Sequence, residues 1–135
     1  MNYDHIIHIK SFYQSFHFQV VDNNSENVII LEDDAKFEVN FKSTLNHIMN
    51  QIDENSIEWD LLYLNRNILA PEMETWNYDV EFRHGFGLMN PSYSYSTVAY
   101  GLSVNGAIKL INSDALQKIL PVDEFLPLMF DRQPK

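Results

Sequence analysis

The stretch that decides the fold is Val28-Ile29-Ile30-Leu31-Glu32-Asp33-Asp34, in which four apolar residues run directly into three acids. A short, continuous apolar run predicts a strand that is buried on both faces. Three carboxylates at its end repel one another and are costly to bury, so they favour an exposed strand end or a shared cation. Strand ends are where ligand sites usually form in α/β sheets. A solvated acidic turn explains the same residues, and the pattern alone leaves both interpretations open.

Length and composition narrow the class of protein. With 135 residues, 45% of them apolar and 13% aromatic, the chain is one domain or part of a larger one, with enough apolar side chains for a core. The net charge of −10 argues against nonspecific binding to nucleic acid or to an anionic membrane. It fits a cation-dependent site, and it equally fits simple solubility. The absence of cysteine excludes disulfides and zinc–thiolate sites.

The N-terminal part shows no recognisable targeting signal. No apolar run approaches the ~20 residues of a membrane span, and no basic region followed by an apolar core predicts a signal peptide. Apolar residues at spacings of three and four predict an amphipathic helix within residues 3–21: Ile6, Ile9, Tyr13, Phe16 and Val20. We expect His5, His8 and His17 to be surface or partly packed histidines rather than metal ligands. Asn23-Asn24-Ser25 is a glycosylation sequon, which matters only in a secretory compartment.

A helix and a second strand follow the acids. Apolar residues at i, i+3, i+4 and i+7 predict a core-facing helix over about residues 40–53: Leu45, Ile48, Met49 and Ile52. The apolar run at 59–64 predicts the next strand. Strand, helix and strand in this order predict a parallel pair with a right-handed crossover. Arg66 would then lie near the acids, either as a phosphate contact or, slightly preferred, as their counter-charge.

The second half begins with an irregular segment. Residues 68–92 show no lasting period, which indicates a functional lid or a disordered insertion. Residues 93–104 are rich in strand formers. Asn105 is a candidate cap for a short helix over 106–111, and Asp114 for another over 115–120. In the apolar stretch 121–131, Asp123 is either a cap or a carboxylate whose apolar surroundings suit a general base.

Five motifs occur in a fixed order along this chain. They are Leu31-Glu32-Asp33-Asp34, Trp59-Asp60-Leu61-Leu62-Tyr63-Leu64, Tyr93-Ser94-Tyr95-Ser96-Thr97-Val98-Ala99-Tyr100, Ser103-Val104-Asn105-Gly106-Ala107-Ile108-Lys109-Leu110, and Leu120-Pro121-Val122-Asp123-Glu124-Phe125-Leu126-Pro127-Leu128-Met129-Phe130-Asp131. In this order they resemble glycosyltransferase family 25, and within it the branch of the procollagen galactosyltransferases and the cerebral endothelial cell adhesion molecule. The likeness covers about Phe12 to Pro134. The last motif favours this collagen-modifying branch over the bacterial lipooligosaccharide galactosyltransferases.

The resemblance implies a GT-A-type, Rossmann-like fold of a nucleotide-diphospho-sugar transferase. It also implies UDP-galactose as donor, hydroxylysine of collagen as acceptor, and an endoplasmic reticulum lumen location. Carried onto this sequence, the metal-binding motif is Glu32, Asp33 and Asp34. Carboxylate oxygens suit Mn2+ or Mg2+, and such a cation neutralises the charge that builds on the departing UDP.

The resemblance also implies candidate residues for the chemistry. Forming a β-linked galactoside from an α-linked donor in one displacement needs a base that deprotonates the acceptor hydroxyl. Asp123 is the first candidate for this base and Glu124 the second. Tyr95 and Thr97 are candidates for hydrogen bonds to the sugar or phosphate, and inert core or surface roles are the alternative for both.

The sequence departs from the family pattern at both ends. Lys10-Ser11-Phe12-Tyr13 stands where the family has a nucleotide-binding βα unit and a Ser-His-Tyr-like helix. The family's later segment with further aspartates and a histidine does not follow. We therefore expect a partial catalytic domain with an incomplete GT-A-like fold. A catalytically inactive relative that acts as a binding or adhesion module is the main alternative. A generic cation-binding module would explain Glu32–Asp34 but not the later motifs.

Overall fold

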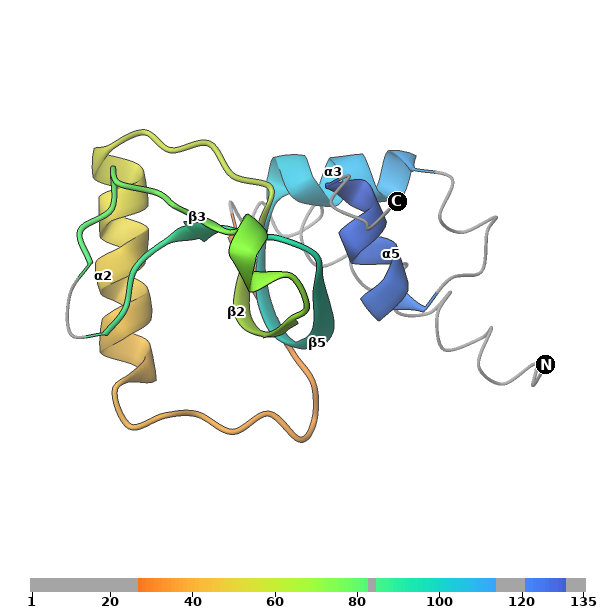
Figure 1. Cartoon of the computed structure of the whole chain (residues 1–135), viewed down its shortest axis with the longest axis horizontal. Helices are drawn as coiled ribbons and strands as arrows, with labels where there is room; N and C mark the ends of the chain where they lie inside the picture. The colour runs from red at the N-terminus through yellow and green to blue at the C-terminus, as the bar shows by residue number, and fades with distance from the viewer. Residues whose placement is uncertain (1–26, 83–84, 114–120, 131–135) are drawn as a thin grey trace.

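The computed structural model describes residues 27–82, 85–113 and 121–130. They form a mixed α/β arrangement of small sheets and helices (Figure 1), so the predicted α/β class is confirmed at this level. In chain order the elements are β1 (Asn27–Leu31), α2 (Phe41–Glu54), β2 (Leu61–Ile68), the 3-10 helix η1 (Pro71–Met73), β3 (Thr75–Trp76), β4 (Met89–Asn90), β5 (Ser94–Ser103), α3 (Val104–Asn112) and α5 (Val122–Met129).

β5 is the central strand of a three-stranded sheet with the order β1-β5-β2. Both neighbours are antiparallel to it, with Asn27 of β1 opposite Ser103 and Leu61 of β2 opposite Leu102. β1 and β2 therefore run in the same direction without being hydrogen-bonded to each other, and the predicted parallel pair is wrong. The physical reason is that β5 has the longest run of strand-forming residues and pairs along both of its edges.

β1 lies at the edge of this sheet and is not buried on both faces as predicted. Ile29 and Leu31 are 48% and 42% exposed, whereas Val28 and Ile30 pack against the core. The strand that is buried on both faces is β5, in which every residue from Ala99 to Ser103 is buried. A continuous apolar run thus predicted a strand correctly but did not distinguish an edge from a centre.

The core lies where α3 and α5 pack against β5. Tyr100 contacts Phe125 and Leu126 of α5, and Leu102 contacts Ala107 of α3. In Figure 1, α5 lies to the right of β2 and β5, and α2 lies to the left. The N-terminus of α5 is therefore anchored by the buried side chains that immediately follow its two acids.

α3 begins one residue after β5 ends. The Ser103 side chain is the N-cap, and its Oγ accepts a hydrogen bond from Gly106 N at 3.0 Å. The predicted cap, Asn105, lies inside the helix instead, because the strand passes into the helix without an intervening turn. Gly106 also packs directly on the Asp60 carbonyl, whose oxygen accepts a hydrogen bond from Ser103 N at 3.1 Å.

α2 matches the helix predicted over residues 40–53. Its apolar side faces a cavity of about 690 Å³, with Leu45 and Ile48 on the helix side and Leu62 and Leu64 on the β2 side. The loop after β3 binds the C-terminal part of α2. Asn55 Nδ2 donates to the Asp79 carbonyl at 2.9 Å.

The segment predicted as irregular contains short elements. η1 leads into β3, which pairs with β4 in a two-stranded antiparallel sheet. Trp76 of β3 makes an edge-to-face contact with Phe82, with ring centroids 5.2 Å apart. The stretch is therefore a small hairpin packed beside the main sheet.

Several predictions fall outside the described residues: the helix within 3–21 with His5, His8 and His17, the sequon at 23–25 and the helix over 115–120. Within the ranges that are described, no helix is long and apolar enough to cross a membrane.

Candidate functional site

The acidic run and the C-terminal acids meet at one hydroxyl group. Thr97 Oγ1 lies 2.7 Å from Glu32 Oε1 and 2.9 Å from Asp123 Oδ1, and Thr97 is only 3% exposed. Glu32 is held against β5 because its backbone N–H donates to the Val98 carbonyl at 2.9 Å. Residues proposed from the sequence as a metal ligand, a substrate contact and a base thus lie side by side.

The two C-terminal acids occupy the first turn of α5. Asp123 and Glu124 follow the N-cap residue Pro121, where negative charge is stabilised by the exposed N–H groups and dipole of the helix. The helix also contains Pro127. Since proline has no N–H, the Asp123 carbonyl cannot receive the usual hydrogen bond from the residue four positions later. In the side chain, Oδ1 contacts Thr97 Oγ1, and Oδ2 is the second acceptor oxygen.

Two tyrosines border these acids. Tyr95 O–H donates to Glu124 Oε1 at 3.3 Å, and its pKa is raised by desolvation and by the charge of Glu124. Burial raises the pKa of Tyr63 to about 12; Arg66 opposes this rise and the Asp123 charge adds to it. Both phenols therefore stay protonated at neutral pH and can act as hydrogen-bond donors. Tyr63 was not identified as a site residue from the sequence. Its only signal there was a hydroxyl group within an otherwise apolar strand.

Asp33 and Asp34 lie in the exposed turn that follows Glu32. Among the residues that the structure describes, no three His, Cys, Asp or Glu side chains are grouped so as to hold a metal ion. Cations that bind nucleotide phosphates commonly use only one or two protein carboxylates, because phosphate oxygens and water complete the shell. Thr97 has a single hydroxyl hydrogen, so it donates to one of the two carboxylates at a time. This hard-oxygen set fits Mn2+ or Mg2+ in kind.

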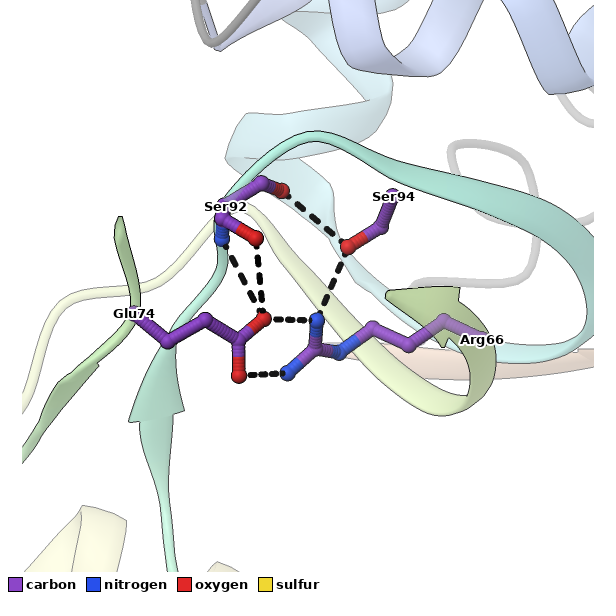
Figure 2. A network of polar contacts seen from close by, with 4 residues as sticks. All are labelled: Arg66, Glu74, Ser92 and Ser94. Carbon is purple, nitrogen blue, oxygen red and sulfur yellow. Dashed lines mark hydrogen bonds and ion pairs between the residues drawn. The ribbon is translucent and has the colours of Figure 1, made fainter. Parts of the chain in front are cut away.

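Arg66 lies within β2 and does not serve as counter-charge to the Glu32–Asp34 run. Its guanidinium binds Glu74, through an Nη1–Oε1 pair and an Nη2–Oε2 bond of 2.9 Å, and Nη1 also donates to Ser94 Oγ at 2.8 Å (Figure 2). The prediction that Arg66 is the counter-charge of this run is therefore wrong, because its partner is a different acid, Glu74. Both Nη atoms of the Arg66 guanidinium bind Glu74, so a phosphate would have to displace this carboxylate to bind Arg66.

The Glu74 carboxylate is the centre of this buried network. Its side chain is 3% exposed, and Oε1 also accepts hydrogen bonds from Ser92 N at 3.4 Å and Ser92 Oγ at 3.2 Å (Figure 2). The hydrogen bonds from Arg66 lower the pKa of Glu74, against the opposing effect of burial. The network fastens the residues before β3 to β2 and β5. Glu74 was not identified from the sequence, because an acid in an irregular segment carries no pattern.

Comparison of the sequence with known proteins identifies the family of this chain. Residues 11–126 match the profile of glycosyltransferase family 25, described as an LPS biosynthesis protein. The chain is 42% identical over 116 residues to the human inactive glycosyltransferase 25 family member 3, covering 86% of this chain and 19% of that protein. It is 43% identical over 107 residues to a glycosyltransferase 25 family member of Drosophila pseudoobscura, covering 79% of this chain and 16% of that protein.

A named galactosyltransferase is similar as well. The zebrafish (Danio rerio) procollagen galactosyltransferase 1 is 37% identical over 116 residues, which cover 86% of this chain and 18% of that protein. The chain thus spans about a fifth of the length of these relatives. No solved structure matches it. The profile match and the relatives together show that the chain belongs to glycosyltransferase family 25.

Proposed function

We propose that this chain forms the metal and base region of a galactosyltransferase that transfers galactose from UDP-galactose to hydroxylysine of collagen. The observation that carries the proposal is the contact of Thr97 with both Glu32 and Asp123. It joins a candidate metal ligand to a candidate base, although they are far apart in the sequence. Similarity to procollagen galactosyltransferases supports the substrate class. The collagen-modifying resemblance also supports a location in the endoplasmic reticulum lumen.

Glu32, with Asp33 and Asp34 in the following turn, would hold Mn2+ or Mg2+ against the donor diphosphate. When bound, the cation neutralises the negative charge that develops on the leaving UDP. The exposed position of the turn leaves these carboxylates accessible to a nucleotide sugar. The Tyr95 O–H donates to Glu124 Oε1, so in this role it would exchange that carboxylate for a sugar or phosphate oxygen.

Asp123 is the proposed general base. The acceptor hydroxyl oxygen forms a bond to the anomeric carbon of galactose, and the bond from that carbon to the diphosphate oxygen breaks. The acceptor proton passes to the Asp123 carboxylate, which the first turn of α5 holds in place. Glu124 is the alternative base, and its Oε1 accepts from Tyr95. Asp123 is preferred because its Oδ1 contacts Thr97, which also contacts the candidate metal ligand Glu32.

The test is transfer or hydrolysis of UDP-galactose with Mn2+ by the full chain. Asp123→Asn should abolish turnover while leaving UDP–Mn2+ binding within about twofold, since a general base contributes roughly 10²–10⁴-fold to rate. Asp34→Ala should weaken Mn2+ binding. Equal turnover in the wild type and Asp123→Asn would contradict the assigned base, and equal Mn2+ affinity in Asp34→Ala would contradict the metal motif.

A second candidate is a non-catalytic family member that acts as a binding or adhesion module. It is favoured by the names of several similar relatives, which are described as inactive at 42–44% identity. Calorimetric titration with UDP and Mn2+ separates the two functions. Absence of binding at millimolar concentration would favour the non-catalytic module.

A further inference from the structure

Thr97 occupies a position that a substrate contact does not explain. It is 3% exposed, and its Oγ1 already lies within hydrogen-bond distance of two carboxylate oxygens, at 2.7 Å and 2.9 Å. A hydroxyl on the surface of a pocket would offer at least one free bonding direction to a ligand. The Thr97 hydroxyl is instead used inside the protein.

The backbone next to Thr97 departs from regular strand geometry. Ser96 has φ +90°, a left-handed conformation that is strained for a residue with a side chain. β5 is also bulged here, because Ala99 and Tyr95 lie opposite Asn65 and Asn67, so three residues of β5 face one of β2. Bulges turn side chains out of the regular alternation and are common beside active sites. Strain next to Thr97 thus accompanies its contact with two acids.

The two carboxylates are carried by structurally independent segments. Glu32 directly follows the edge strand β1, while Asp123 lies in the first turn of α5. Each segment has its own anchor: the Glu32 N–H bond to Val98 O, and the burial of Phe125 and Leu126. Thr97 of the central strand contacts both side chains, and so it can fix their mutual placement.

We propose that Thr97 is a positioning residue that holds Glu32 and Asp123 in the arrangement needed for cation and acceptor binding; this inference rests on the proposed function. The hydroxyl hydrogen serves one carboxylate at a time. While both are ionised, the other carboxylate is open to solvent or to a ligand, since Glu32 is exposed and Asp123 is half-buried. Once Asp123 has received a proton, it can donate to Thr97 Oγ1 while Thr97 donates to Glu32, and all three groups are then bonded.

Three variants of the full chain test this role. Thr97→Val keeps the side-chain shape and removes the hydroxyl, Thr97→Ser keeps the hydroxyl, and Ser103→Ala removes a buried hydroxyl of the same strand that only caps α3. Mn2+ affinity is measured by calorimetry in the presence of UDP, at a temperature where circular dichroism shows each variant folded. UDP-galactose turnover is measured in parallel.

Thr97→Val should weaken Mn2+ binding by about tenfold, the lower end of the effect of losing a partner that orients a metal ligand. Thr97→Ser and Ser103→Ala should stay within about twofold of the wild type. Wild-type affinity in a folded Thr97→Val chain, with the wild type binding Mn2+, would overturn the positioning role and leave the proposed function standing. If the wild type itself binds neither Mn2+ nor UDP, the proposed function and this inference both fall.

Discussion

Replacing Glu74 by glutamine tests whether the buried Arg66–Glu74 pair holds the hairpin segment in place. The substitution keeps the size of the side chain and removes its charge. Oε1 can still accept from Ser92, but an amide group replaces Oε2 and directs its hydrogens at Arg66 Nη2. Arg66 would keep Ser94 Oγ as a partner while its positive charge, on a side chain only 15% exposed, loses its counter-ion.

The size of the effect follows from these contacts. Breaking a buried ion pair by removing one charge typically costs ~3–5 kcal/mol. Glutamine retains part of the hydrogen bonding, so we expect the lower end, about 3 kcal/mol of unfolding free energy. This is a large share of the ~5–15 kcal/mol that stabilises a typical domain. The loss should be seen first in the hairpin segment, because the network is what ties that segment to β2 and β5.

The effect should also depend on pH. Arg66 and Ser92 lower the pKa of Glu74 from its ordinary value of 4.5. The stabilisation by the ionised carboxylate is therefore fully present above pH 4.5, and it is lost as the pH falls through the lowered folded-state pKa. The stability difference between the wild type and Glu74→Gln should be constant near neutral pH and should shrink in acid.

Urea denaturation at pH 7 and at several acidic pH values measures both effects. Glu72→Gln is the matched control, since Glu72 is exposed two residues away in η1, and it should change stability by less than about 0.5 kcal/mol. A Glu74→Gln loss no larger than that of Glu72→Gln, or a difference that grows in acid, would refute the assigned role of the network.

Two further pairs of substitutions test the backbone at Gly106 and at Ser96. Gly106→Ala would place a Cβ on the Asp60 carbonyl oxygen and should cost about 3 kcal/mol in thermal or urea unfolding, because backbone cannot move aside as a flexible side chain can. Gly101→Ala is its control: the added Cβ would meet Leu62 Cβ at an ordinary 3.6 Å, so an equal loss in both variants would refute the close-approach argument. Ser96→Gly should leave stability unchanged or raise it by up to about 1 kcal/mol, since glycine adopts φ +90° without strain. Ser96→Val should lower stability by about 1–3 kcal/mol, and a more stable Ser96→Val chain would contradict the strained conformation.

Local patterns predicted the elements well. The apolar run at 28–31, the helical spacing over 40–53 and the strand-forming run over 93–104 correspond to β1, α2 and β5. The helix over 106–111 corresponds to α3, though with a different cap. Each of these depends on side chains within a few residues of one another, and such spacing is readable without knowing the rest of the chain.

Pairing between distant segments was not readable in the same way. Strand, helix and strand in succession suggested neighbouring parallel strands, but β5 arrives later and lies between them. For the site, Glu32, Thr97 and Asp123 were each identified from the motifs. Their contact was not predicted, because it depends on the order of the strands in the sheet. Glu74 had no signal at all, because its role comes entirely from the partner it meets in space.

The central place of β5 has a consequence for how the chain folds. The hydrogen-bond partner of Glu32, Thr97, lies 65 residues further along the chain. β1 and β2 also have no neighbouring strand in this sheet until β5 (Ser94–Ser103) has been synthesised. Contacts over such separations carry a large loop-closure entropy and slow folding. During synthesis at roughly 5–20 residues per second, β1 leaves the ribosome several seconds before the strand that completes it. Glu32, Thr97 and Asp123 can therefore come into contact only after the strands and α5 have assembled.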